Sequence, residues 1–476
     1  MARTRRPLAA PLSRSSLPLQ EQLYRRIRDA ITEGRLVPGE RLPAVRTLAS
    51  DLGVARGTAE SAYSRLASEG YLVAQGPAGT IVSPSLRIEM LHRPAPLKDT
   101  SWKTDRGVRE PLPFQLGLPA LDMFPRALWA RLTARAARRL SGALLAYQDA
   151  MGFSDLREAI ASYLAVSRGV RCQPGQVVIT GGYQAGLELI ARLLLRPGDE
   201  VWFEEPGYFL ARQELQAAGL ALRPVPVDDE GLDVEAALRI APRVRLAVVT
   251  PAHQSPLGVA LSLARRQALL AWAAETGAWI VEDDYDGEFH YVGRKLPALK
   301  SLDAADRVIY AGSFSKTLFP SLRLGYLVLP NVLVRTLEEA KRKAFHGEPV
   351  LEQMVTADFL AGGHFGRHLR RMRSLYSTRR DALVRALADT FGAGIDIAGH
   401  RGGLALLARF PNGDSDVVLA RSAAAHGLAP TALSSQYLGR PRAQGLLLSF
   451  TNIPEEQSRR MARVLHQALA DHLPRR

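Results

Sequence analysis

The chain has 476 residues, of which 47% are hydrophobic and 23% are charged, values that are ordinary for a globular protein of two or three domains. Its apolar runs are far shorter than the roughly 18 residues of a membrane span, and no apolar segment follows the basic N-terminal residues, so a membrane or secreted protein is not expected. The single cysteine, Cys172, excludes an internal disulfide and a cysteine-based zinc site and favours the cytoplasm, and we expect no metal site.

The net charge of +15 is densest near the N-terminus. Residues 1–113 contain 18 basic and 11 acidic side chains, a surplus of seven in less than a quarter of the chain. A polyanion such as nucleic acid is therefore an expected partner of this segment, while a solvated arginine-rich surface is the alternative. Residues 1–16, "MARTRRPLAAPLSRSS", have no apolar periodicity and are expected to form a disordered basic arm.

Three short helices and a hairpin are predicted over residues 17–84. "LQEQLYRRIRDAITEG" and "RLPAVRTLASDLG" each have apolar residues at helical spacing and end at a glycine. The third stretch, "VARGTAESAYSRLASEGY", has one apolar face and leaves Arg56, Thr58, Ser61 and Arg65 on the other. Two short helices around a tight turn make a helix-turn-helix, whose second helix presents its early residues to the DNA major groove. "YLVAQGPAGTIVS" alternates and turns within "GPAGT", which predicts a two-stranded wing.

This segment resembles the winged helix-turn-helix of GntR-type transcription regulators. The resemblance implies that Arg46 and Arg56 contact DNA, that Thr58 lies near a phosphate or base edge, and that Gly79 lies at the wing tip. Two departures are visible: Ala44 stands where the family often has a capping serine, and "GPAGT" replaces the commoner "GSGT". The alternative interpretation is a small helical domain with solvated arginines.

Residues 85–113 show no sustained periodicity, contain several prolines and have mixed charge. Such a stretch is longer than ordinary loops within a compact domain. We therefore expect a linker here, and a second domain over residues 114–476.

The second domain is predicted to be α/β with a mostly parallel sheet. Short apolar runs rich in β-branched or aromatic residues, namely "QVVIT", "EVWFEEP", "LAVVTP", "AWIVEDDY", "RVIYAG" and "GYLVL", alternate with helical stretches such as "YQAGLELIARLLLRPG". In such sheets the functional residues lie at the carboxyl ends of the strands. Polar side chains follow the predicted strands at these ends: Tyr183, Gln184, Tyr208, Asp283, Tyr285 and Lys316.

A shielded lysine can form a Schiff base with an aldehyde, and pyridoxal phosphate is the common aldehyde cofactor. Lys316 is the candidate for this attachment, Asp283 for pairing with the pyridine nitrogen, Tyr285 for bonding the ring hydroxyl and Tyr208 for stacking on the ring. Each residue alone is a weak signal, but the order of all four along the chain supports a pyridoxal phosphate site.

The phosphate of such a cofactor also needs hydrogen-bond donors from the protein. "TGGYQAG" opens a helix whose first N–H groups suit an anion, and the guanidinium of an arginine fits phosphate geometry. The predicted phosphate-binding residues are Gly182, Tyr183, Gln184, Ser313, Ser315 and Arg323.

Residues 114–476 resemble the fold type I aminotransferases in "YQDAMGFSDLREAIASYLAVSRGV", "PGYFLAR", "VEDDYDGEF" and "SFSKTLFPSLRLGY". A GntR-type reader fused to such a domain resembles the MocR regulators over the whole chain. The resemblance implies a transcription regulator that binds operator DNA as a head-to-tail homodimer and senses a small amine, an amino acid or pyridoxal phosphate itself.

The competing hypothesis is a working aminotransferase with a basic N-terminal extension. Against it, Ser255 stands where these enzymes commonly have an Asn that contacts the cofactor, and Leu447 stands where they have an Arg that binds the substrate carboxylate. Arg212 or Arg442 could bind an effector instead. A DNA-binding protein without a ligand, the third hypothesis, would leave Lys316 and its neighbours unexplained.

Overall fold

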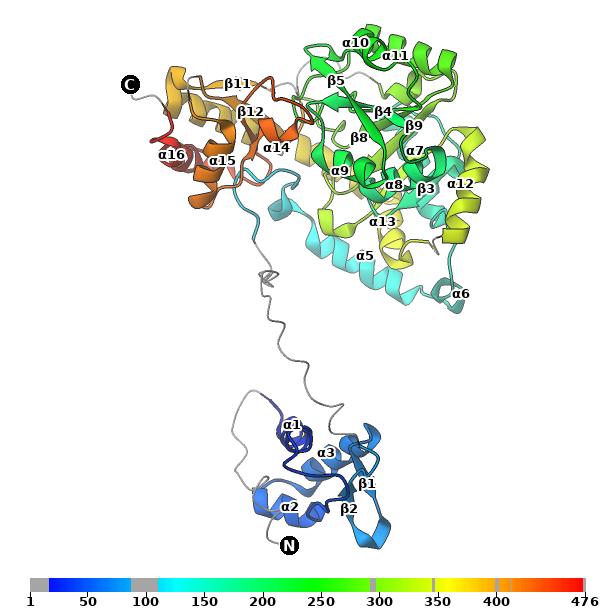
Figure 1. Cartoon of the computed structure of the whole chain (residues 1–476), viewed down its shortest axis with the longest axis vertical. Coiled ribbons are helices and arrows are strands. Elements are labelled where there is room, and N and C mark those ends of the chain that lie inside the picture. Colours follow the sequence, from blue (N-terminus) through cyan, green and yellow to red (C-terminus); the bar gives the residue numbers. More distant parts are fainter. Residues whose placement is uncertain are drawn as a thin grey trace. The chain divides into compact units, whose positions relative to one another are not determined.

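The computed structural model describes residues 17–86, 110–291, 297–344, 347–398, 402–411 and 413–473. The predicted basic arm and most of the predicted linker, residues 87–109, lie outside these residues. The chain divides into two compact units, Met1–Val108 and Arg109–Arg476, which Figure 1 colours blue and cyan to red. Within the described ranges, no helix has both the length and the apolar character that a membrane crossing requires.

The N-terminal unit contains the predicted three helices and hairpin. Its elements are α1 (Leu19–Thr32), α2 (Val45–Leu52), α3 (Arg56–Ser68), β1 (Leu72–Ala74) and β2 (Thr80–Val82). Gly53 ends α2 with a φ of 64°, a left-handed conformation that glycine adopts without strain, and so turns the chain into α3. The apolar faces of the helices share one core with β1 and β2, which pair antiparallel. The predicted helix-turn-helix and wing are confirmed.

The large unit is built on a sheet in the order β3-β10-β9-β8-β7-β4-β5-β6. Its strands β9, β8, β7, β4 and β5 run parallel, whereas β10 is antiparallel to both of its neighbours and β6 is antiparallel to β5. The strands are β3 (Val177–Thr180), β4 (Glu200–Glu205), β5 (Ala221–Asp228), β6 (Gly231–Leu232), β7 (Leu246–Val249), β8 (Trp279–Asp284), β9 (Val308–Ser313) and β10 (Gly325–Val328). Most central strands are buried along their whole length, as expected for a sheet covered on both faces, and the predicted α/β fold is confirmed.

Helices surround this sheet (Figure 1). They are α5 (Arg126–Arg138), α6 (Gly142–Leu145), α7 (Ser154–Ser167), α8 (Tyr183–Leu194), α9 (Phe209–Ala217), α10 (Val234–Ile240), α11 (Leu263–Thr276), α12 (Asn331–Ala344) and α13 (Val350–Ala361). The long helix α14 (His364–Phe391) leads from this layer to the C-terminal part of the unit.

The C-terminal part is a second, antiparallel sheet in the order β11-β12-β14-β13. Its strands are β11 (Asp396–Ala398), β12 (Ala405–Arg409), β13 (Thr431–Ala432) and β14 (Leu446–Ser449), and its helices are α15 (Asp416–Ala425) and α16 (Ser458–Leu469). Apolar residues of α14, α15 and α16 join those of β12 and β14 in one core.

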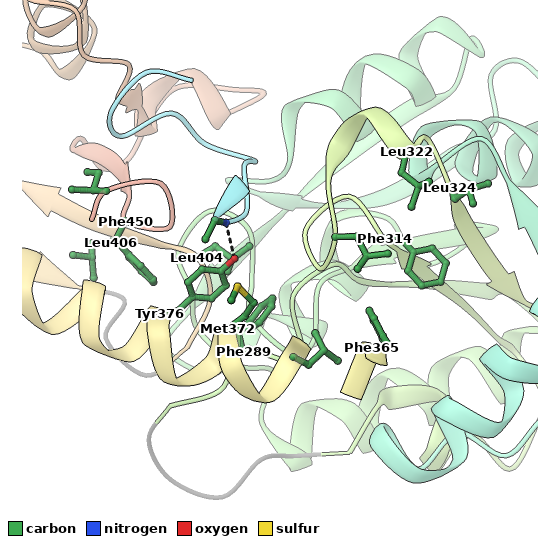
Figure 2. Close-up of a cluster of buried hydrophobic side chains, with 14 of the residues drawn as sticks. Phe289, Phe314, Leu322, Leu324, Phe365, Met372, Tyr376, Leu404, Leu406 and Phe450 are labelled. Carbon is green, nitrogen blue, oxygen red and sulfur yellow. Dashed lines mark hydrogen bonds between the residues drawn. The ribbon is translucent and has the colours of Figure 1, made fainter. Parts of the chain in front are cut away.

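The same apolar core holds the loop that carries Lys316. Figure 2 shows Phe314 and Leu322, from either side of that lysine, in the cluster that α14 supplies with Phe365 and Met372. On the other side of the cluster, the Tyr376 hydroxyl accepts a hydrogen bond from the backbone N–H of Ala120 at 2.9 Å. The lysine loop is therefore anchored by packing contacts with α14.

Candidate functional site

Lys316 lies in the loop that follows β9. Burial of the flanking Phe314 and Leu318 fixes the loop, and the Lys316 amine donates a hydrogen bond to the carbonyl of Gly117 at 3.0 Å. Gly117 has a φ of 85°, a left-handed conformation that glycine adopts without strain, and a Cβ there would lie 2.9 Å from that amine. Burial lowers the pKa of Lys316, which increases the neutral, nucleophilic fraction of its amine.

Asp283 lies near the carboxyl end of β8, on the opposite face of the strand from its acidic neighbours. Glu282 accepts hydrogen bonds from the backbone N–H groups of Leu299 and Lys300, and Asp284 pairs with Arg168. Because side chains alternate along a strand, Asp283 points the other way, toward Lys316. Burial raises the pKa of Asp283 well above its ordinary value.

Four other predicted side chains gather around Asp283. The carboxylate interacts electrostatically with Tyr183, Tyr208 and Tyr285, and with the Lys316 amine. The ring centroids of Tyr183 and Tyr208 lie 6.4 Å apart. Burial raises the pKa of Tyr208 to about 12 and holds that of Tyr285 well above its ordinary value, so these phenols stay protonated at neutral pH. The tertiary structure thus brings together residues at the ends of four strands, β3, β4, β8 and β9.

The predicted phosphate side is formed by the start of α8. Gly182 precedes this helix with a φ of 104°, and a Cβ at Gly325 would lie 3.0 Å from the Gly182 backbone, so both positions require glycine. Tyr183 and Gln184 begin the helix, where backbone N–H groups point outward. A helix start of this kind is suited to an anion.

The remaining predicted phosphate residues lie in the Lys316 loop. The Ser313 hydroxyl accepts a hydrogen bond from the backbone N–H of Ser315 at 3.1 Å, which tightens the turn before the lysine. Arg323 is exposed and has a φ of 51°, a left-handed conformation that is unfavourable for a side chain of this size. Strain of this kind is concentrated at functional positions.

The loop after β7 was only partly anticipated from sequence. Ser255, which stands where aminotransferases commonly have an Asn, hydrogen-bonds Tyr285. Two neighbouring residues were not predicted: the side-chain amide of Gln254 donates to Glu204 at 3.1 Å and to the Pro206 carbonyl at 2.8 Å, and the Thr250 hydroxyl donates to the same glutamate. Gln254 therefore holds the loops after β4 and β7 together, and the signal for it was the polar "HQ" between two apolar stretches.

Neither predicted effector arginine joins the group around Asp283 in any contact that the structure records among its described residues. Arg212, on α9, donates to the carbonyls of Tyr437 and Ser435 at 2.6 and 3.4 Å. Arg442 is exposed in the turn before β14. Leu447 lies on β14 and is 2% exposed.

In the N-terminal unit, the predicted DNA-contacting residues lie at the surface. Arg46, Arg56, Ser61 and Gly79 are exposed and Thr58 is partly exposed. Arg46 belongs to α2, Arg56, Thr58 and Ser61 belong to α3, and Gly79 lies at the wing tip.

Two other arginines of this unit were not among the predicted DNA contacts. Arg65 forms ion pairs with Glu21 and Glu69 and stacks on Tyr24 with its guanidinium 3.8 Å from the ring centroid, so it stabilises the contact between α1 and α3. Arg41, which was not predicted, is exposed, and a Cβ at Gly79 would lie 3.3 Å from its guanidinium Nε. Arg41 therefore places a positive charge at the wing tip, where the wing turn "GPAGT" has no basic residue of its own.

The two units match two families. The family described as aminotransferase class I and II, whose members depend on pyridoxal phosphate, matches residues 120–465, and the gntR family of bacterial regulatory proteins matches residues 19–82.

Individual relatives agree with this division. The chain is 38% identical to a probable rhizopine catabolism regulatory protein MocR of Rhizobium meliloti, over 94% of this chain and 92% of that one. It is 34% identical to the pyridoxine biosynthesis transcriptional regulator PdxR of Corynebacterium glutamicum, over 94% and 95%. Among solved structures, a Pyrococcus horikoshii kynurenine aminotransferase in complex with PMP matches 77% of this chain and 93% of its own, with a TM-score of 0.70 and 29% identity.

The similarity to regulators covers nearly the whole chain, and both the helix-turn-helix and the aminotransferase fold agree with it, so the family of this protein is shown. The chain belongs to the MocR-type subfamily of GntR-family DNA-binding transcription regulators.

Proposed function

We propose that this regulator binds pyridoxal phosphate on Lys316 and uses it to sense a small amine or the supply of the cofactor itself. The observation that carries the proposal is the group around Asp283, in which a partly buried lysine, a buried carboxylate and three tyrosines lie beside a helix start that suits an anion. Such a set fits the cofactor chemically, because burial disfavours the ionised form of Asp283 and a protonated ring nitrogen beside it would stabilise that form.

Each residue of the set has a role in this proposal. Lys316 attaches the cofactor, whose contribution when bound is an aldehyde carbon that accepts an amine. Asp283 pairs with the ring nitrogen, Tyr285 and Ser255 bond the ring hydroxyl, and Tyr208 flanks the ring. Gly182, Tyr183, Gln184, Ser313, Ser315 and Arg323 hold the phosphate.

An absorbance spectrum of the purified full-length protein tests this proposal directly. We expect a visible band from the covalently attached cofactor, and a shift of that band when an effector amine is added. A protein that shows no such band after incubation with pyridoxal phosphate would refute the proposed cofactor site.

Arg323→Ala should weaken cofactor binding by about 10- to 100-fold, because the phosphate loses a charge-assisted hydrogen-bond donor worth about 1.5–3 kcal/mol. The measurement is a titration of the cofactor-free protein followed by absorbance. Arg192→Ala, which removes an exposed arginine paired with Glu188 on α8, is the matched control and should bind normally. Equal affinities in the two variants would remove Arg323 from the phosphate site.

The domain boundaries proposed above are a basic arm at 1–16, the reader at 17–84, a linker at 85–113 and the effector domain at 114–476. Near the proposed boundaries, Leu86 packs on the reader core, and the carbonyl of Pro113 accepts a hydrogen bond from the backbone N–H of Ala429. We further propose a head-to-tail homodimer that acts in the cytoplasm, with two reader domains bound to one operator. Effector binding and operator binding are then coupled, because the effector binds two arrangements of the dimer with different affinity.

Arg46→Ala and Arg56→Ala should each weaken operator binding by about 1–3 kcal/mol, because both exposed guanidiniums contact DNA in this proposal. Arg335→Ala on the large unit, 90% exposed and paired only with Glu339 among the contacts recorded, is the control. Fluorescence anisotropy with operator DNA measures the effect, and wild-type affinity should fall steeply with salt. Unchanged affinity in both reader variants would move the DNA surface elsewhere.

We propose that multiple-turnover transamination of α-amino acids is absent, since Leu447 supplies no carboxylate partner. The fold is that of an aminotransferase, so the proposal concerns activity alone. Rapid, repeated formation of keto acid from a common amino acid would overturn it and favour the enzyme hypothesis.

A further inference from the structure

The arginines of the N-terminal unit divide into those that pair with an acidic side chain and those that do not. The paired ones are Arg25 with Glu21, Arg28 with Asp29, Arg35 with Glu33, and Arg65 with Glu21 and Glu69. Arg41 and Arg46 have no acidic partner among the residues that the structure describes. A positive charge without an internal partner is available to a polyanion, so Arg41 belongs with Arg46 on electrostatic grounds.

The backbone holds Arg41 beside the wing. Residues 39–42 run antiparallel to β2, where Arg41 pairs with Ile81, and backbone hydrogen bonds on either side of that pair join the two segments. The carboxylate of the adjacent Glu40 accepts a hydrogen bond from the backbone N–H of Val37 at 2.9 Å, so it is engaged elsewhere. Arg41 is therefore a fixed and uncompensated charge on the third strand of the wing.

The wing itself is small and uncharged at its tip. Residues 72–82 contain no Lys, Arg, Asp or Glu, and residues 73–79 are all exposed. Gly79 has a φ of 97° and a ψ of −158°, a conformation almost confined to glycine, and a Cβ there would lie 3.3 Å from the Arg41 Nε. The tip thus presents one guanidinium on a turn without bulky side chains.

A narrow tip with a single guanidinium is suited to the minor groove of DNA. That groove is about 6 Å wide and is narrower over A·T tracts, where its negative potential attracts arginine. An α-helix fits the wider major groove instead, which is where the early residues of α3 are expected. Arg41 and α3 therefore suit different grooves of one duplex.

We propose that Arg41 is a further DNA-binding residue of this regulator and that it reads A·T base pairs in the minor groove next to the segment that α3 contacts. The inference rests on the operator contacts proposed for Arg46 and Arg56 and adds a second recognition element to them. It does not depend on the cofactor site.

The first test uses the full-length protein and a DNA duplex that the wild type selects from a random library. The selected sequences should contain A·T pairs flanking the central half-sites. In fluorescence anisotropy, Arg41→Ala should weaken binding by about 5- to 100-fold, the range expected for one base contact. Arg25→Ala, which removes a 50% exposed arginine paired with Glu21, is the matched control and should bind as the wild type does. Thermal unfolding of both variants should be unchanged, since both side chains are exposed.

Base substitutions in the flanking pairs identify the groove. Replacing A·T with G·C adds the guanine 2-amino group to the minor groove and should weaken wild-type binding about tenfold. Inosine·cytosine has the major-groove hydrogen-bonding groups of G·C but lacks that amino group, so it should restore binding. Arg41→Ala should bind all three duplexes equally. Arg41→Lys should keep part of the affinity but lose most of the preference, because an ammonium is more strongly hydrated and lacks the planar fork.

Each outcome decides between this inference and the operator contacts beneath it. Normal binding by Arg41→Ala, together with a loss in Arg46→Ala, overturns the role of Arg41 and leaves the proposed helix contacts in place. Normal binding by both variants overturns both. A loss in Arg41→Ala that comes from a phosphate contact would leave the wild-type preference among the three duplexes unchanged and would lower the salt dependence, and it overturns minor-groove reading. Selected duplexes without flanking A·T pairs overturn it as well.

Discussion

Lys316→Ala should abolish the covalent attachment of pyridoxal phosphate completely, the largest effect expected from any single substitution in the site. The visible band should disappear, because no other amine approaches Asp283 in the contacts that the described residues make. Non-covalent binding should persist in part, since Asp283, Tyr208 and the start of α8 remain. The measurement is absorbance after dialysis, with mass spectrometry after borohydride reduction to locate the adduct.

The matched control for this variant is Lys343→Ala. Lys343 is an exposed lysine in the last turn of α12, and its removal should leave both the band and the reduced adduct unchanged. An unchanged band in Lys316→Ala, or an adduct on another lysine in the wild type, would contradict the assignment of Lys316. Full operator response to the effector in Lys316→Ala would show that sensing does not need covalent attachment.

Arg168→Met should lower the free energy of unfolding of the large unit by about 3–5 kcal/mol, because it leaves the buried carboxylate of Asp284 without its cation. Arg168 and Asp284 are 2% and 4% exposed, and the guanidinium donates to Asp284 at 2.5 Å and to the Gly287 carbonyl at 3.1 Å. The Tyr310 hydroxyl donates to the same carboxylate at 2.6 Å. Denaturant unfolding followed by intrinsic fluorescence measures the change.

Two controls separate the buried pair from ion pairs in general. Arg223→Met breaks the Arg223–Glu200 pair, whose side chains are 45% and 36% exposed, and should cost about 0–1 kcal/mol. Combining Arg168→Met with Asp284→Asn should recover part of the lost stability, since the uncompensated charge is then removed. A loss in Arg168→Met no larger than in Arg223→Met would mean that Asp284 is protonated in the folded protein and that the pair is not ionic.

The buried pair also bears on the site, because Asp284 is the neighbour of Asp283 on β8. If Arg168 fixes the end of this strand, Arg168→Met should weaken cofactor binding in protein that is still folded. The Tyr310 hydroxyl bonds the same oxygen as Arg168, so Tyr310→Phe should give a smaller effect in the same direction.

Local sequence patterns were sufficient to predict the helices and strands and the residues at which they end. Helical spacing and terminal glycines predicted α1, α2 and α3, and short β-branched runs predicted the central strands, because these patterns express contacts within a few residues. The polar residues at strand ends then predicted the group around Asp283, because parallel strands end at one edge of the sheet. Alternation along β8 is likewise local, and it directs Asp283 and Asp284 to opposite faces.

Partners that lie far apart in the sequence were decided by the tertiary structure alone. Arg65 had the spacing of an exposed DNA-facing residue, yet Glu21, 44 residues away, pairs with it. Arg212 resembled a free cation, but the carbonyls of residues 435 and 437 accept its hydrogen bonds. Arg168 meets Asp284 across 116 residues.

The sequence by itself therefore determined the fold class and the reader, and it predicted which residues gather around Asp283, since each depends on periodicity or on order along the chain. Only the tertiary structure decided which charged side chains are available to a ligand. An arginine that is already bonded to the protein looks the same in sequence as one that is not, because its partner comes from another element that folding brings beside it.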